Sequence, residues 1–196
     1  SRLLTRKTIS DMTTCGTISK NLTLAECGNS VAGIEASFVL MNFDDIDRSE
    51  STETGDVLSD ITMKDGKHGY RYESHNNSFE SSVAFNNGTY SKAFTHQVII
   101  RVFSKTQEVK DQLNALAQGR VVVKNKTNRN PEAKYEVYGW ENGLEVSDFQ
   151  ATSTDADGGV YTITLASRDD SREGMLPVSF YAGSEAQTEA AVEALL

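Results

Sequence analysis

Apolar residues fall at every second position through much of this chain, which is the period of β-strands with one buried face. Two such segments lie close together, SFESSVAF at 78–85 and FTHQVIIRVF at 94–103. The buried face of the first is expected to hold Phe79, Ser81, Val83 and Phe85, and that of the second Phe94, His96, Val98, Ile100 and Val102. Between them, Asn86–Gly88 is expected to supply the positive φ values of a tight turn.

Further strands are predicted on both sides of this pair. GIEASFVLMNF at 33–43 is a strand rich in bulky apolar groups, and RVVVK at 120–124 is another. KYEVYGW at 134–140 alternates and is followed by Glu141-Asn142-Gly143, a strong hairpin signal. STDADGG at 153–159 predicts a second turn, before a strand with Tyr161, Ile163 and Leu165 on one face.

The period changes to that of a helix only after residue 104. Val109, Leu113, Leu116 and Ala117 recur at helical spacing, which predicts one principal helix at about 105–118. Ser104 and Gln107 fit a capping box, and Gly119 fits a C-terminal stop. The C-terminal tail at 183–196 is able to form a second short helix, with Ser184 and Gln187 as its capping box, provided that it docks on the rest of the chain.

An acidic stretch interrupts the strands at 44–60. It holds seven carboxylates against Arg48 alone among basic residues, and it has no helical periodicity. One interpretation is a solvated loop or hairpin arm. The alternative is an extended arm that contacts a neighbouring subunit, because a segment of this length exceeds what a turn needs.

Charge limits the classes of partner. The chain of 196 residues carries a net charge of −9 and has a sequence pI near 4.8. This balance argues against wrapping nucleic acid through phosphate contacts, which needs clustered Lys and Arg. It does not exclude a protein that lets DNA slide past without holding it. No apolar run approaches the roughly 20 residues that span a bilayer.

Residues with catalytic or metal-binding chemistry are present but form no recognisable set. Cys15 and Cys27 are twelve residues apart, and His68, His75 and His96 do not cluster with them at the spacing of a zinc site, so free thiols or one local disulfide are expected. No nucleophile elbow, P-loop, zincin or dinucleotide motif occurs. The prediction is no enzyme activity, no catalytic, cofactor-binding or metal-binding residue, and no cofactor. Four N-x-S/T triplets, which begin at Asn21, Asn76, Asn87 and Asn125, are expected to arise by chance.

Trp140 is the single tryptophan of the chain, and Glu141 and Glu145 flank it in sequence. An aromatic ring beside carboxylates suggests a ligand platform. Trp140 also closes an alternating strand directly before a turn, and this position favours a partly buried packing residue.

The order of the segments resembles the tail tube (major tail) proteins of phages that infect Bacteroidetes-type bacteria. The resemblance covers roughly residues 13–180. It rests on GIEASFVLMNFDDI, an acidic arm ending in VLSDI, NNSFESSVAFNNGTYSKAFTHQVIIRVF, QEVKDQLNALAQGRVVV, YGWENGLEVSDF and GGVYTITLAS, in that order. These motifs are diffuse patterns, so their order carries the resemblance.

This resemblance implies a mainly β fold, a β-sandwich able to join a barrel, with one flanking α-helix. We expect a tail-tube-like domain at 15–182, preceded by an N-terminal extension at 1–14 and followed by a tail at 183–196; the first eleven residues and the C-terminal segment lie outside the resemblance, and Met12 is a candidate start residue. Subunits of the family form hexameric rings that stack into a hollow tube. A terminator, a tape measure and a baseplate are the implied partners, and a virion tail assembled in the host bacterial cytoplasm is the implied location.

Two alternatives remain at this stage. The chain could be another component of a tail, neck or contractile injection machine. It could also be a β-sandwich that binds carbohydrate or a partner protein through Trp140 and the tyrosines.

Overall fold

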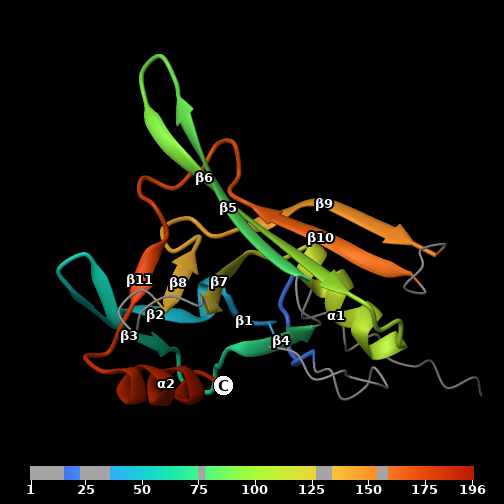
Figure 1. Ribbon diagram of the computed structural model, residues 1–196, viewed down its shortest axis with the longest axis horizontal. Coiled ribbons are helices and arrows are strands. Elements are labelled where there is room, and N and C mark those ends of the chain that lie inside the picture. Colours follow the sequence, from blue (N-terminus) through green and yellow to red (C-terminus); the bar gives the residue numbers. More distant parts are fainter. Residues whose placement is uncertain (1–15, 23–35, 75–77, 127–133, 154–158) are drawn as a thin grey trace, which may run out of the picture.

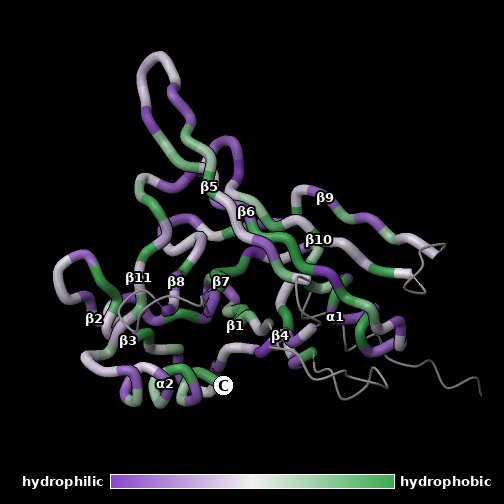
Figure 2. Tube along the Cα trace, in the orientation of Figure 1, coloured by the Kyte–Doolittle hydropathy of each residue, from purple (hydrophilic) through white to green (hydrophobic). Residues whose placement is uncertain are grey.

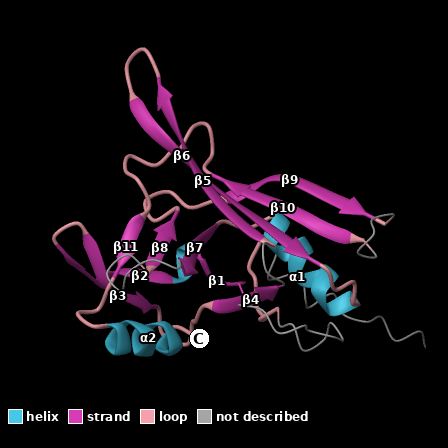
Figure 3. Cartoon of the chain, in the orientation of Figure 1, coloured by secondary structure: helices cyan, strands magenta, loops and turns pink. Residues whose placement is uncertain are grey.

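The computed structural model describes residues 16–22, 36–74, 78–126, 134–153 and 159–196. Within these ranges the chain is mainly β, with two sheets and two α-helices (Figures 1 and 3). The mainly β fold with a flanking helix that the sequence predicts is therefore confirmed. Residues 1–15, with Cys15, and the segments that contain Cys27, His75, Asn76 and Asp155–Asp157 lie outside the described ranges.

The larger sheet, sheet A, has seven strands in the order β2-β3-β11-β8-β7-β1-β4. Their bounds are β2 Ile46–Thr54, β3 Val57–Met63, β11 Val178–Phe180, β8 Tyr135–Tyr138, β7 Val121–Lys126, β1 Ala36–Asn42 and β4 Tyr70–Ser74. A single 3-10 turn, η2 Phe43–Asp45, links β1 to β2. Sheet B has four strands in the order β5-β6-β10-β9, namely β5 Phe79–Asn87, β6 Lys92–Val102, β10 Val160–Ala166 and β9 Glu145–Thr152.

Strand β1 lies between β7 and the edge strand β4 of sheet A and is buried on both faces, which explains its unbroken apolar run. Phe38 and Leu40 enter one core cluster, whereas Val39 and Met41 enter another. The neighbouring strand β7 divides in the same way, because Val123 belongs to the first cluster and Val122 to the second.

The first cluster lies between the two sheets. Phe38 of β1 and Phe79 of β5 meet with ring centroids 4.3 Å apart. From sheet B, Ile100 and Ile163 are fully buried in the same cluster. The predicted buried face of β6 is confirmed from His96 to Val102. The predicted buried face of β5 is wrong in part: Phe79 and Val83 are half-buried, whereas Ser81 and Phe85 are exposed, because β5 is an edge strand whose far end leaves the core.

Helix α1 spans Gln107–Ala117 and buries Val109, Leu113 and Leu116 in this first cluster. Its N-cap is Thr106, whose Oγ1 accepts a hydrogen bond from the Val109 N–H at 3.3 Å. The predicted cap at Ser104 is wrong because the chain is still an extended link from β6 at that point. Gly119 follows the helix, as predicted. A side chain does not fit at this position, because a Cβ there would lie 2.1 Å from the Gly16 carbonyl oxygen.

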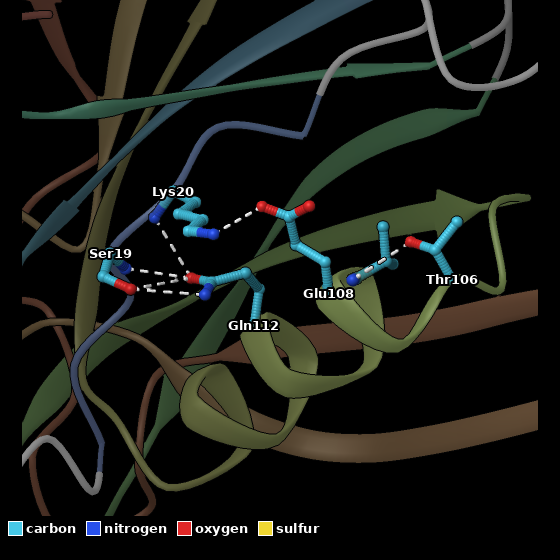
Figure 4. Close-up of polar contacts among 6 residues, drawn as sticks. Ser19, Lys20, Thr106, Glu108 and Gln112 are labelled. Carbon is cyan, nitrogen blue, oxygen red and sulfur yellow. Dashed lines mark hydrogen bonds and ion pairs between the residues drawn. The ribbon is translucent and has the colours of Figure 1, made fainter. Parts of the chain in front are cut away.

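Helix α1 also holds the segment 16–22 against the body of the protein (Figure 4). The Gln112 Oε1 accepts hydrogen bonds from the backbone N–H groups of Ser19 and Lys20, at 2.9 and 3.1 Å. An ion pair of 2.6 Å joins Lys20 to Glu108. On the other side, the Asn42 side chain donates to and accepts from the Ile18 backbone at 3.1 Å. One glutamine and one asparagine thus hold residues 18–20, and backbone pairing with β4 begins only at Leu22.

Helix α2, Glu185–Ala194, covers the opposite face of sheet A and confirms the predicted C-terminal helix. Ser184 is its N-cap, as predicted, and accepts from the Gln187 N–H at 3.2 Å. Val192 and Leu195 pack into the second core cluster beside Met41 and Phe180. In Figure 1 this helix and the β5–β6 hairpin lie on opposite sides of the molecule.

Two predicted turns differ in the structure. Asn86 and Asn87 remain paired in β5, opposite Ala93 and Lys92, so the turn is formed by residues 88–91. The Asn142-Gly143 hairpin is also wrong, because β8 pairs in sheet A whereas β9 pairs in sheet B. This turn carries the chain from one sheet to the other. A separate short strand, β11, has no alternating signal of its own and was not predicted.

Candidate assembly surfaces

The hairpin of β5 and β6 extends beyond the two-sheet body (Figure 1). Nine residue pairs join the strands, from Phe79↔Ile100 to Asn87↔Lys92. At its base, Val83 packs against the first core cluster. At its tip, the Gly88 N–H donates to the Ser91 carbonyl at 2.9 Å. The hairpin therefore has a rigid base and an end that the subunit itself does not cover.

Aromatic side chains are exposed toward the tip of this hairpin. Tyr90 is 100% exposed and Phe85 is 56% exposed. Phe85 contacts Phe94 across the hairpin, with centroids 5.4 Å apart. Coloured by hydropathy, the tip of the hairpin is neutral to hydrophilic, and apolar stretches lie below it on the arms (Figure 2). An exposed aromatic group on a preformed hairpin is the usual anchor of a protein interface.

Sheet edges form a second potential contact. Strand β9 lies at one edge of sheet B, and most of its side chains are exposed, Phe149 at 40%. Strand β4 is an edge of sheet A, but Leu22 bridges to Tyr72 and hydrogen-bonds the backbone of Arg71 and Glu73. Sheet A is thus partly closed at β4, whereas β9 presents free backbone groups along the described part of the sheet, a template for pairing with another chain.

The acidic stretch is a two-stranded hairpin, β2–β3, rather than a loop. Gly55 at φ 66° closes its tip, and the register shifts between Asp47 and Thr52. Asp47 organises that bulge by accepting from the Ser49 N–H and hydroxyl. These two bonds lower the pKa of Asp47, the Ser49 hydroxyl bond having the larger effect. Glu50 and Asp56 are exposed, so the outer face of this hairpin is negatively charged.

Trp140 is buried, with 6% of its surface exposed, and belongs to the second core cluster. The Arg48 guanidinium lies 4.2 Å from the centroid of its ring. Its Nε1 donates to Glu53 at 3.3 Å. The prediction of a packing residue is confirmed, and the indole presents no open face on which a sugar could stack. Trp140 instead fixes strand β2 of the acidic hairpin to the body, through Arg48 near the start of the strand and Glu53 near the tip of the hairpin.

His96 is buried, and both of its ring nitrogens have backbone partners. The Gly139 N–H donates to Nδ1 at 3.1 Å, and Nε2 donates to the Met175 carbonyl at 2.8 Å. Burial lowers the pKa of His96, although the Met175 carbonyl partly opposes this shift. A neutral ring matches both bonds, so His96 holds the connection between the sheets in place.

Glu173 is the buried carboxylate of the same region. Its two oxygens accept from the backbone N–H groups of Glu141 and Asn142, at 2.9 and 3.0 Å. Its own backbone pairs with Phe94 in both directions. Burial raises the pKa of Glu173 despite these two bonds. Sequence reasoning missed this residue, because nothing in RDDSREGM distinguishes one carboxylate from its neighbours.

Among the described residues, no three His, Cys, Asp or Glu side chains form a group that could hold a metal ion. The helices within the described ranges include none that is long and apolar enough to cross a bilayer.

Comparison with known proteins identifies no relative. No family model, curated protein or solved structure matches this chain.

Proposed function

We propose that this chain is a structural subunit of a phage tail tube, which stacks as rings to form a conduit for DNA. The order of its sequence segments, its mainly β fold and its acidic balance support the proposal. The observation that carries it is the β5–β6 hairpin, which projects from the body with Tyr90 fully exposed. A monomer gains nothing from this exposure, whereas a ring would bury the tyrosine between subunits.

Sheet geometry supports the same function. An open β9 edge is a liability for a free subunit, and closing it against a neighbour removes unpaired backbone groups. A head-to-tail contact joins different surfaces of identical subunits. It produces a closed ring when the rotation from one subunit to the next divides evenly into a full turn. The hairpin and the β9 edge are two such different surfaces.

The first test is direct imaging of the concentrated protein by negative-stain electron microscopy, with the critical concentration measured by sedimentation. Wild type should form hollow tubes. Tyr90→Ser should raise the critical concentration by about tenfold or more, which corresponds to about 1.4 kcal/mol per contact and is modest for a buried aromatic anchor. Its thermal midpoint should be unchanged, because the side chain contacts nothing in the monomer.

Thr89→Ala is the matched control at the same tip and should assemble like wild type. Rings that close but do not stack would fit a neck or terminator component instead. A wild type that stays monomeric at high concentration contradicts the proposal. If Tyr90→Ser forms normal tubes, the hairpin tip is not part of the contact between subunits.

A further inference from the structure

The chain contains two Asn-Gly pairs, Asn87-Gly88 and Asn142-Gly143, in very different surroundings. In such a pair the backbone nitrogen of the glycine is able to attack the side-chain carbonyl carbon of the asparagine. Glycine favours this attack because it has no Cβ to obstruct a close approach and because its backbone is free to rotate. A fold that holds both the asparagine amide and the glycine nitrogen prevents the reaction, whereas an open turn allows it.

Asn142 is held firmly in the turn that joins the two sheets. Its Nδ2 donates to the Arg172 carbonyl at 2.8 Å, and its backbone N–H donates to Glu173 at 3.0 Å. Gly143 is buried, and its N–H donates to the Gly139 carbonyl at 2.9 Å. The Gly143 nitrogen reaches the Asn142 side chain only if this whole turn opens, so Asn142 is expected to remain an asparagine.

Asn87 lies at the last residue pair of the β5–β6 hairpin, and both Asn87 and Gly88 are exposed (Figure 1). The Asn87 side chain forms no hydrogen bond with any residue in the described ranges. The Gly88 N–H donates across the turn to the Ser91 carbonyl at 2.9 Å. Opening this bond frees the nitrogen without disturbing either core cluster, and such local openings cost much less free energy than global unfolding.

We propose that Asn87 is a site of spontaneous covalent modification, at which the exposed turn converts asparagine to aspartate and isoaspartate. The Gly88 nitrogen loses its proton to solvent and forms a bond to Cγ of Asn87. The bond from Cγ to the side-chain nitrogen breaks, and that nitrogen takes up a proton and leaves as ammonia. Water then opens the cyclic imide. Hydrolysis at Cγ gives aspartate, and hydrolysis at the backbone carbonyl carbon gives isoaspartate, so water is the only co-reactant.

The two products change the hairpin in different ways. Aspartate keeps the backbone of β5 and faces Lys92 across the last residue pair, where opposite charges attract. Isoaspartate inserts a methylene group into the backbone, so the pairing with Lys92 loses its register. Either product places a new carboxylate beside the turn that carries the exposed Tyr90. The inference does not depend on the tail tube proposal, because the reaction takes place in the free subunit.

The test follows both Asn-Gly pairs in one sample of the full chain, kept dilute so that it remains unassembled, at mildly alkaline pH. Peptide mapping by mass spectrometry detects the mass change when an amide becomes a carboxylate, and chromatography separates aspartate from isoaspartate. In the folded protein Asn87 should convert about tenfold or more faster than Asn142, because Asn142 reacts only after its turn opens. In concentrated urea the two rates should become similar, since both asparagines then have the same freedom and the same glycine neighbour.

Two variants at the tip identify the attacking atom. Gly88→Ala keeps Asn87 but should slow its conversion about tenfold or more, in urea as well as in the folded protein, because a Cβ crowds the ring closure. In the folded protein this Cβ would lie 3.0 Å from the Ser91 carbonyl oxygen, so the thermal midpoint is measured alongside. Thr89→Ala is the matched control and should convert like wild type.

Three results would overturn the proposal. The first is equal conversion of Asn87 and Asn142 in the folded protein. The second is an intact Asn87 in the folded protein after a period in which the urea-unfolded chain has converted. The third is conversion of Gly88→Ala at the wild-type rate, which would mean that the Gly88 nitrogen is not the attacking group.

Discussion

At the scale of single residues, this protein handles its buried polar groups in two different ways. His96 and Glu173 are satisfied by backbone atoms, and each fixes a turn that joins the two sheets. Lys124 has only aromatic faces around its amine. A satisfied buried group specifies a structure, whereas an unsatisfied one costs stability.

The low pKa of His96 predicts a pH dependence of stability. Because the folded pKa lies below the unfolded value, the native state binds fewer protons, and the contribution of His96 is lost as pH falls from about 6.5 through the folded pKa. Glu173 has a raised pKa and changes stability with pH in the opposite direction. The pH dependence of the wild-type stability alone therefore does not isolate the contribution of His96. The difference in unfolding free energy between wild type and His96→Gln should shrink between about pH 7.5 and pH 5.

Urea unfolding at a series of pH values measures this difference. His68→Gln places the same substitution at an exposed ring and serves as the control. A difference for His96→Gln that stays constant across the range would mean that His96 has the same pKa in the folded and unfolded states, contrary to this assignment.

At the scale of elements, helix α1 both covers the core and holds the segment 16–22. Val109, Leu113 and Leu116 do the first task, and the polar side chain of Gln112 does the second. The helix therefore needs a glutamine at a position that is 7% exposed, where an apolar residue would be the ordinary choice.

Gln112→Met should lower the free energy of unfolding by about 1–3 kcal/mol, because two backbone N–H groups lose their acceptor. Gln107→Met on the exposed face of the same helix should change it by less than about 0.5 kcal/mol. Hydrogen exchange of the Ser19 and Lys20 amides locates the effect. Unchanged protection of those amides in Gln112→Met would show that another group holds the segment.

At the scale of the whole molecule, the β2–β3 hairpin is anchored along β2 by Trp140 and carries exposed acidic side chains. Arg48 and Glu53 contact Trp140, so removing the whole arm would also expose a core tryptophan. A test of its role in assembly must therefore change charge and leave these contacts in place.

Glu50→Lys combined with Asp56→Lys meets that condition, since both side chains are exposed. The thermal midpoint should stay within about 2 °C of wild type, as expected for surface changes. If the hairpin contacts a neighbouring subunit, tube formation should fall, and added salt should change the defect by screening the charges. If this variant forms tubes of normal yield and length at low salt, the acidic hairpin does not contribute to the interface between subunits.

Local patterns in the sequence were enough to predict the strands of sheet B, the two helices and the buried Trp140. Each depends on periodicity or on a cap within a few residues. The Ser184 cap was found in this way, and the Ser104 cap was wrong by two residues because neighbouring Ser and Thr residues are equally able to cap. The resemblance to tail tube proteins, which depends on the order of these segments, stays a prediction.

The tertiary structure alone decided that β8 and β9 belong to different sheets. Asn142-Gly143 has the composition of a hairpin, yet its flanking strands pair with β7 and β10, because burying both faces of sheet A outweighs a local turn preference. The same packing brings Glu73, Lys124 and α2 around one cavity from positions 51 residues or more apart. The sequence does not predict that these residues come together, because their proximity results from long-range packing and not from local propensity.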